Sequence, residues 1–196
     1  PRVEFKDVTF RYPKADEISL ASLESAAKLE TVDSGEILKG ISFTAEPGTL
    51  TALVGPSGAG KTTLLNVLAG YIEPTSGKAI LPFMKSEKHF VSTVFQDLRL
   101  LSRKTCEDNL WLAYDAGVYA SKTDFYQEME SLTRHLNIHS HLGKKMEDCN
   151  GGLRQKMAMV RALLAKPTAL LADEPTSSLD KDNSYKLFEL LNHYNH

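Results

Sequence analysis

The pattern of apolar and polar positions divides the chain into short alternating stretches and longer helical ones. Val3–Phe5 and Val8–Tyr12 alternate apolar and polar side chains, which predicts a hairpin of two half-buried strands. Further strands are expected at Ile37–Thr44, Leu50–Val54, Phe90–Phe95 and Ala169–Ala172. Residues 15–36 are less regular and are interpreted as an insertion.

Helical periodicity is clearest in the second half of the chain. An apolar stripe recurs there at spacings of four, three and four, formed by Phe125, Met129, Leu132 and Leu136. Helices are also expected at Thr62–Ala69, which Gly70 would end, and at Gly152–Ala165 and Asn183–His193. Strands that alternate with helices predict an α/β domain with a mainly parallel sheet. The helical pattern at about residues 100–165 predicts a helical subdomain within it.

Composition narrows the class of protein without naming a function. The 196 residues are enough for one compact domain over 1–196, with 42% apolar and 24% charged residues. A net charge of −2 gives no sign of a nucleic-acid-binding surface, and no apolar run approaches the roughly 20 residues of a membrane span. Cys106 and Cys149 are too few for a disulfide framework and are interpreted as reduced thiols in a cytosolic setting. The six histidines show no metal-ligand spacing.

The strongest chemical signal is a glycine-rich loop between an expected strand and an expected helix. It fits G-x-x-x-x-G-K-[ST] at every fixed position, with the sequence Gly55-Pro56-Ser57-Gly58-Ala59-Gly60-Lys61-Thr62. Glycines let successive backbone amides turn toward phosphate oxygens, and the start of the following helix, including Thr63, adds its positive dipole end. Lys61 would reach the β- and γ-phosphates and the Thr62 hydroxyl would bind Mg²⁺. The loop predicts a binding site for a nucleotide with Mg²⁺.

A carboxylate at the end of a neighbouring strand is the second part that such a loop requires. Ala169–Ala172 is a short apolar run that leads directly into Asp173 and Glu174. Asp173 would hold the metal through water. Glu174 would polarise the attacking water as a general base.

The residues after Glu174 resemble a known family. The run Asp173-Glu174-Pro175-Thr176-Ser177-Ser178-Leu179-Asp180 resembles the Walker B motif and D-loop of ABC ATPases. Val94-Phe95-Gln96-Asp97 resembles the Q-loop, and Tyr12 resembles the aromatic residue that stacks on adenine. Cys149-Asn150-Gly151-Gly152-Leu153 stands where the L-S-G-G-Q signature belongs.

The resemblance implies a P-loop NTPase fold with a RecA-like core, an N-terminal antiparallel β subdomain and a helical subdomain. It implies catalytic roles for Glu174 and Gln96, and a metal site formed by Thr62, Gln96 and Asp173. Asn150, Gly151 and Gly152 would contact the ATP of a second nucleotide-binding domain, beside the D-loop residues Ser178 and Asp180. The implied function is ATP hydrolysis that powers an ABC transporter, with a transmembrane permease as partner, at the cytoplasmic side of the membrane.

Three departures from the family pattern matter. The family's Leu, Ser and Gln of the signature are replaced by Cys149, Asn150 and Leu153, although Asn150 can still cap the following helix. The family continues beyond Asp180 through a further strand to a histidine, and His193 and His196 arrive too early for that role, so the C-terminal part is expected to be missing. Residues 15–36 lengthen the interval between Tyr12 and Gly55.

Two other functions stay open at this point. A degenerate domain that binds ATP, dimerises and hydrolyses little would explain the altered signature. A soluble ABC ATPase without a transport role would normally bring basic surfaces or zinc-binding cysteines, and neither is visible. The cargo and the direction of transport are not encoded in this sequence.

Overall fold

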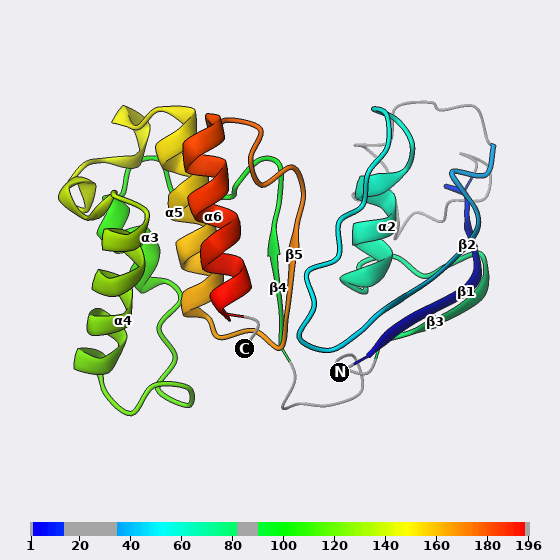
Figure 1. Cartoon of the computed structure of the whole chain (residues 1–196), viewed down its shortest axis with the longest axis horizontal. Helices are drawn as coiled ribbons and strands as arrows, with labels where there is room; N and C mark the ends of the chain where they lie inside the picture. The colour runs from blue at the N-terminus through cyan, green and yellow to red at the C-terminus, as the bar shows by residue number, and fades with distance from the viewer. Residues whose placement is uncertain (1, 14–34, 82–89, 195–196) are drawn as a thin grey trace. The chain divides into compact units, whose positions relative to one another are not determined.

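The structure is a computed structural model that describes residues 2–13, 35–81 and 90–194 (Figure 1). It divides into two compact units. The sheet unit contains Arg2–Pro47 and Ala52–Pro82, and the helical unit contains Gly48–Thr51 and Phe83–His196. Nearly all of the insertion expected at 15–36 lies outside the described residues.

The sheet unit is built on a three-stranded antiparallel sheet with the order β2-β1-β3. Its strands are β1 (Val3–Phe10), β2 (Leu38–Ala45) and β3 (Ser76–Ile80), and the helix α2 (Lys61–Leu68) accompanies them (Figure 1). The central strand β1 buries Val3, Phe5, Val8 and Phe10. The strand expected at Ile37–Thr44 is confirmed as β2, and the expected helix is confirmed as α2, which ends before Gly70 at φ 74°.

The hairpin expected within Val3–Tyr12 is wrong, because β1 is one strand. Its register with β2 shifts between Phe5 and Val8, and Asp7 lies between them at φ 48°. The Asp7 amide donates to the Ser42 hydroxyl at 2.8 Å instead of joining a regular ladder. A local bulge of this kind breaks the alternation of side chains just as a turn would, so the sequence pattern alone indicated a turn.

The strand expected at Leu50–Val54 is also absent from the described residues. Leu50 is 52% exposed and Val54 is 94% exposed, and no ladder partner pairs with this run in the described ranges. A strand exists only where a neighbouring backbone accepts its hydrogen bonds, which an apolar run cannot guarantee. The strand β3 has no clear signal in the sequence. Its Gly77 adopts φ 84°, and a Cβ added there would overlap the Asp7 carbonyl oxygen.

The helical unit pairs two parallel strands with a group of helices. The strands are β4 (Val91–Val94) and β5 (Ala169–Ala172), in register from Val91–Ala169 to Val94–Ala172. The helices are α3 (Cys106–Trp111), α4 (Lys122–His135), α5 (Gly151–Leu164) and α6 (Lys181–Tyr194), with 3-10 turns η4 (His139–His141) and η5 (Met146–Asp148). Figure 1 shows α5 between the strand pair and the helices α3 and α4.

The core of the helical unit confirms the helical predictions made from the sequence. The expected stripe of α4 is buried, and Phe125, Met129 and Leu136 are each 0% exposed. Helix α5 adds Met157, Met159 and Leu164 to the same core. The strands expected at Phe90–Phe95 and Ala169–Ala172 are confirmed as β4 and β5. None of the described helices is both long and apolar enough to cross a membrane.

Candidate functional site

The glycine-rich loop has the backbone conformation that its sequence predicts. Gly58 and Gly60 adopt φ 79° and 87°, in the left-handed region where a side chain is strained. An added Cβ at Gly60 would lie 3.1 Å from Ile37 Cγ2 and 3.2 Å from the Ile37 carbonyl oxygen. Gly60 is therefore required for both its torsion angles and its close packing against the chain before β2.

The loop leads into α2, and Lys61 holds the two together. Gly60 is the N-cap of α2, and it has no side chain with which to cap the helix. Lys61 Nζ donates to the carbonyl oxygens of Gly55 and Pro56, both at 2.8 Å. The ammonium group thus lies over the loop at the positive end of a helix. Such an arrangement suits a phosphate anion.

Tyr12 lies in the same unit as the glycine-rich loop, two residues after the C-terminal end of β1. Its ring packs edge-on against Phe10, with centroids 5.0 Å apart. The Phe10 carbonyl accepts from the Ile37 amide at 2.8 Å, and Ile37 in turn packs against Gly60. Ile37 therefore links the end of β1, and with it Tyr12, to the glycine-rich loop.

The helical unit brings a second group of predicted residues to one edge of the β4–β5 pair. Asp173 and Glu174 directly follow β5, and Gln96 lies two residues after β4. Because the strands are parallel, their carboxyl ends share this edge. The Asp173 amide donates to the Val94 carbonyl at 3.0 Å, which extends the pairing. Gln96, Asp173 and Glu174 thus lie at the carboxyl edge of a parallel sheet, where α/β proteins bind ligands.

The altered signature begins α5 with an intact cap. Asn150 is the N-cap, and its side-chain oxygen accepts from the Leu153 amide at 2.8 Å, as the sequence predicted. A Cβ added to Gly151 would lie 3.2 Å from the Ser178 hydroxyl. A Cβ added to Gly152 would lie 2.9 Å from the Ser178 carbonyl oxygen. The two glycines therefore bring the start of α5 against the D-loop. Leu153, in place of the family's Gln, is only 8% exposed.

Asp180, the second predicted D-loop residue, is engaged at the start of α6. Its carboxylate accepts from the Asn183 amide at 2.8 Å and from the Asn183 side chain at 2.7 Å. These hydrogen bonds, led by the one from the backbone, hold the pKa of Asp180 below its ordinary value. Asp180 thus caps the first turn of α6 and fixes where the D-loop ends.

Two residues that the sequence analysis did not select hold the loops of this edge. Gln155 hydrogen-bonds to the backbone at Glu174 and at Ser178. Arg161 donates to the carbonyl oxygens of Leu98 and Arg99, both at 2.9 Å, in the turn that follows Gln96. Both side chains project from α5, whose remaining inward positions are mostly apolar. A polar residue at a buried position, as for Gln155, or at a half-buried one, as for Arg161, is the signal that could have identified them.

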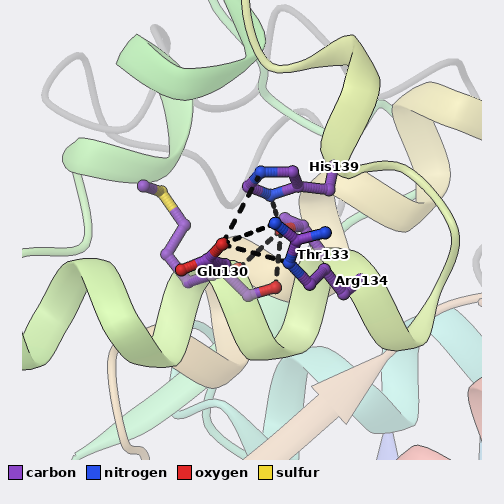
Figure 2. Close-up of polar contacts among 5 residues, drawn as sticks. Glu130, Thr133, Arg134 and His139 are labelled. Carbon is purple, nitrogen blue, oxygen red and sulfur yellow. Dashed lines mark hydrogen bonds and ion pairs between the residues drawn. The ribbon is translucent and has the colours of Figure 1, made fainter.

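The polar contacts of His139 connect it to two residues of α4. His139 Nδ1 lies 3.1 Å from the Thr133 hydroxyl, and its Nε2 lies 4.0 Å from the Glu130 carboxylate (Figure 2). Glu130 also accepts from Arg134 at 2.7 Å, and this bond lowers the pKa of Glu130. A guanidinium group so close to the carboxylate disfavours a metal ion at this cluster.

A family model described as ABC transporter matches residues 38–177. This chain belongs to the ABC transporter family. The matched stretch includes the glycine-rich loop, Gln96, the altered signature and Glu174, while Tyr12 lies outside it.

Relatives within the ABC transporter family include an ATP-binding protein and an ATP-binding/permease protein. The spermidine/putrescine import ATP-binding protein PotA of Spiroplasma citri is 37% identical over 154 residues, covering 76% of this chain and 43% of its own length. The mycobactin import ATP-binding/permease protein IrtB of Mycobacterium bovis is 34% identical over 205 residues, covering 97% of this chain and 32% of its own. The chain thus spans less than half the length of these relatives.

A solved structure confirms the fold class. The dimeric ATP-binding cassette MJ0796, in a post-hydrolysis state bound to ADP and Pi, superposes with a TM-score of 0.74. The match covers 99% of this chain and 83% of the other, at 24% sequence identity, so it bears on the fold alone. The expected α/β P-loop NTPase fold is confirmed.

Proposed function

We propose that this chain is the ATP-binding and ATP-hydrolysing part of an ABC transporter. The observation that carries the proposal is the loop Gly55–Thr62, with its left-handed glycines, its lysine and the following start of α2. Inward-facing amides at a helix N-terminus, together with a lysine, form a binding site for a triphosphate. Membership of the ABC transporter family supports ATP as the nucleotide.

The proposal gives each predicted residue a role. Ser57, Ala59 and Thr63 line the loop with the glycines, and Tyr12 stacks on adenine. The proposal assigns Mg²⁺ to Thr62, Gln96 and Asp173, whose hydroxyl, amide and carboxylate oxygens are of the kind that this ion prefers. Bound Mg²⁺ would neutralise charge that develops on the phosphates. Glu174 orients and deprotonates the attacking water.

The proposed partners are a second nucleotide-binding domain and a transmembrane permease. Asn150, Gly151 and Gly152 would meet the ATP of the second domain, with Ser178 and Asp180 beside them. The dimeric structure of the cassette MJ0796 supports pairing, and the relative IrtB, an ATP-binding/permease protein, supports a permease as partner. We place the chain at the cytoplasmic side of the membrane, either fused to a membrane domain or associated with one.

A second candidate function rests on a specific observation. Leu153 replaces the family's signature glutamine and buries its side chain, so it offers no polar group to a nucleotide. A domain with this change can still bind ATP at its own loop, while the site that its signature completes hydrolyses slowly. In this case the chain would regulate a transporter by ATP-dependent dimerisation.

Substitution of Glu174 separates the two candidates. A general base contributes about 10²–10⁴ to a rate, so Glu174→Gln should reduce ATP turnover by at least about a hundredfold and leave ATP bound. Glu189→Gln, which alters an exposed carboxylate on α6, is the matched control. Turnover is measured as phosphate release with Mg²⁺. Undiminished turnover in Glu174→Gln would remove the assigned base, and equally slow turnover in the parent protein would favour the regulatory candidate.

A further inference from the structure

The side chain of Gln155 bridges two points of the turn that carries Glu174. Its Nε2 donates to the Glu174 carbonyl oxygen at 2.6 Å, and its Oε1 accepts from the Ser178 amide at 2.8 Å. Gln155 is 3% exposed, so water cannot replace these partners easily. Both ends of the amide are satisfied by backbone groups of a single turn.

The backbone at Glu174 needs such support. Glu174 adopts φ 49°, a left-handed conformation that is strained for a residue other than glycine. The turn's own hydrogen bonds, from the Ser177 amide to the Glu174 carbonyl at 3.1 Å and from Leu179 to Thr176 at 3.0 Å, span only its interior. Gln155 is the described side chain that ties this turn to a helix through both a donor and an acceptor.

The position of Gln155 also connects this turn to the signature. Gln155 lies about one helical turn after Gly151 and Gly152 on α5, and both glycines pack against Ser178. A displacement of the start of α5 would therefore move the Gln155 amide and the backbone from Glu174 to Ser178 together. The direction in which the Glu174 carboxylate points depends on this backbone.

We infer that Gln155 is a positioning residue, which holds the turn from Glu174 to Ser178 on α5 and thereby aims the Glu174 carboxylate. The inference rests on the proposed function of Glu174. Gln155 does not contact the nucleotide in this account, so it affects the rate of hydrolysis and not the affinity for ATP.

The test compares Gln155→Met with Gln127→Met. Methionine preserves the length and most of the volume of glutamine but offers neither a strong donor nor a strong acceptor. Gln127 is exposed on α4 and serves as the matched control. Hydrogen exchange at the Ser178 amide, followed by NMR without nucleotide, should accelerate on the order of tenfold in Gln155→Met alone.

Kinetics provide a readout that a purely structural role would not move. The kcat for ATP hydrolysis should fall roughly tenfold to a hundredfold in Gln155→Met, because misplaced groups lose rate, while the Kd for ATP with Mg²⁺ stays within twofold of the parent value. Gln155→Asn keeps an amide that is one methylene too short to span both partners, and it carries the same expectation if Gln155→Met does not fold.

The outcomes separate the inference from the proposed function. Unchanged exchange at Ser178, or an unchanged kcat beside faster exchange, would overturn the positioning role. A proportional loss of ATP affinity and rate would overturn it as well, since it would indicate general damage. A parent protein that binds no ATP would contradict the proposed function, whereas exchange at Ser178 would still decide whether Gln155 holds the turn.

Discussion

At the scale of single residues, the glycines of the altered signature are suited both to a partner's ATP and to close packing within this chain. Their sequence predicts an amide-lined start of α5 for a partner's ATP. The structure adds an internal reason, because Gly151 and Gly152 lie against Ser178 and leave no room for a side chain at Gly152. The glycines of the signature are therefore needed for packing within this chain, independently of any contact with a partner's ATP.

Gly152→Ala tests this packing. Its new Cβ would lie 2.9 Å from the Ser178 carbonyl oxygen, which forces the backbone apart, so the free energy of unfolding should fall by about 1–3 kcal/mol. Gly143→Ala is the control, because an added Cβ there meets nothing within 4 Å. Urea denaturation measures both variants. Equal stability of the two would show that α5 does not need the close approach.

At the scale of elements, the junction between α3 and α5 is formed by the chain's two cysteines. Cys106 begins α3 and Cys149 immediately precedes the cap of α5, with their sulfur atoms 3.5 Å apart. Burial, and then the hydrogen bond with Cys149, raises the pKa of Cys106 to about 12. Both residues are free thiols in the structure, and Cys106 is held in its neutral form.

This junction predicts a loss of stability in alkali. The folded chain keeps the Cys106 proton more tightly than the unfolded chain, so the stabilisation is complete below about pH 9 and decreases as the pH rises toward 12. Urea denaturation between pH 8 and 10.5 should therefore show a shallower decline for Cys106→Ala than for the parent protein, although the variant is less stable at pH 8. Parallel declines would show that Cys106 does not titrate differently on folding.

The elements also show which parts of the fold a sequence can predict. Helices α2, α4, α5 and α6 were predicted because their signals are local, namely apolar periodicity and a terminating glycine. Strands depend on a distant partner. The bulge at Asp7 therefore has the same sequence pattern as a turn, and the apolar run Leu50–Val54 predicts a pairing that the described residues do not contain.

In the candidate site, too, local motifs could be predicted from the sequence and contacts with distant partners could not. The glycine-rich loop and the acids after β5 are contiguous motifs, so their residues could be named from the sequence. The contacts of Gln155 and Arg161 could not be named, because their partners lie 19 to 63 residues away and are backbone groups, which carry no residue-type signature. The structure alone identifies such contacts.

At the scale of the whole molecule, the proposed residues are distributed over both units. The sheet unit contains Tyr12 and the loop that would bind phosphate, and the helical unit contains Gln96, Asp173, Glu174 and the signature. Binding of ATP can therefore be tested at the loop separately from hydrolysis, which the proposal assigns largely to residues of the helical unit. The chain's affinity for ATP is the property on which every later step depends.

Isothermal titration calorimetry of ATP, with and without Mg²⁺, tests this central property most directly. Lys61→Ala removes the ammonium group at the loop, and Lys78→Ala removes an exposed one on β3 as the control. We expect Mg²⁺-dependent binding in the parent protein and in Lys78→Ala, with affinity reduced roughly 10- to 100-fold in Lys61→Ala because a charge-assisted hydrogen bond to phosphate is lost. The absence of Mg²⁺-dependent binding, or equal affinities in all three proteins, would contradict the account.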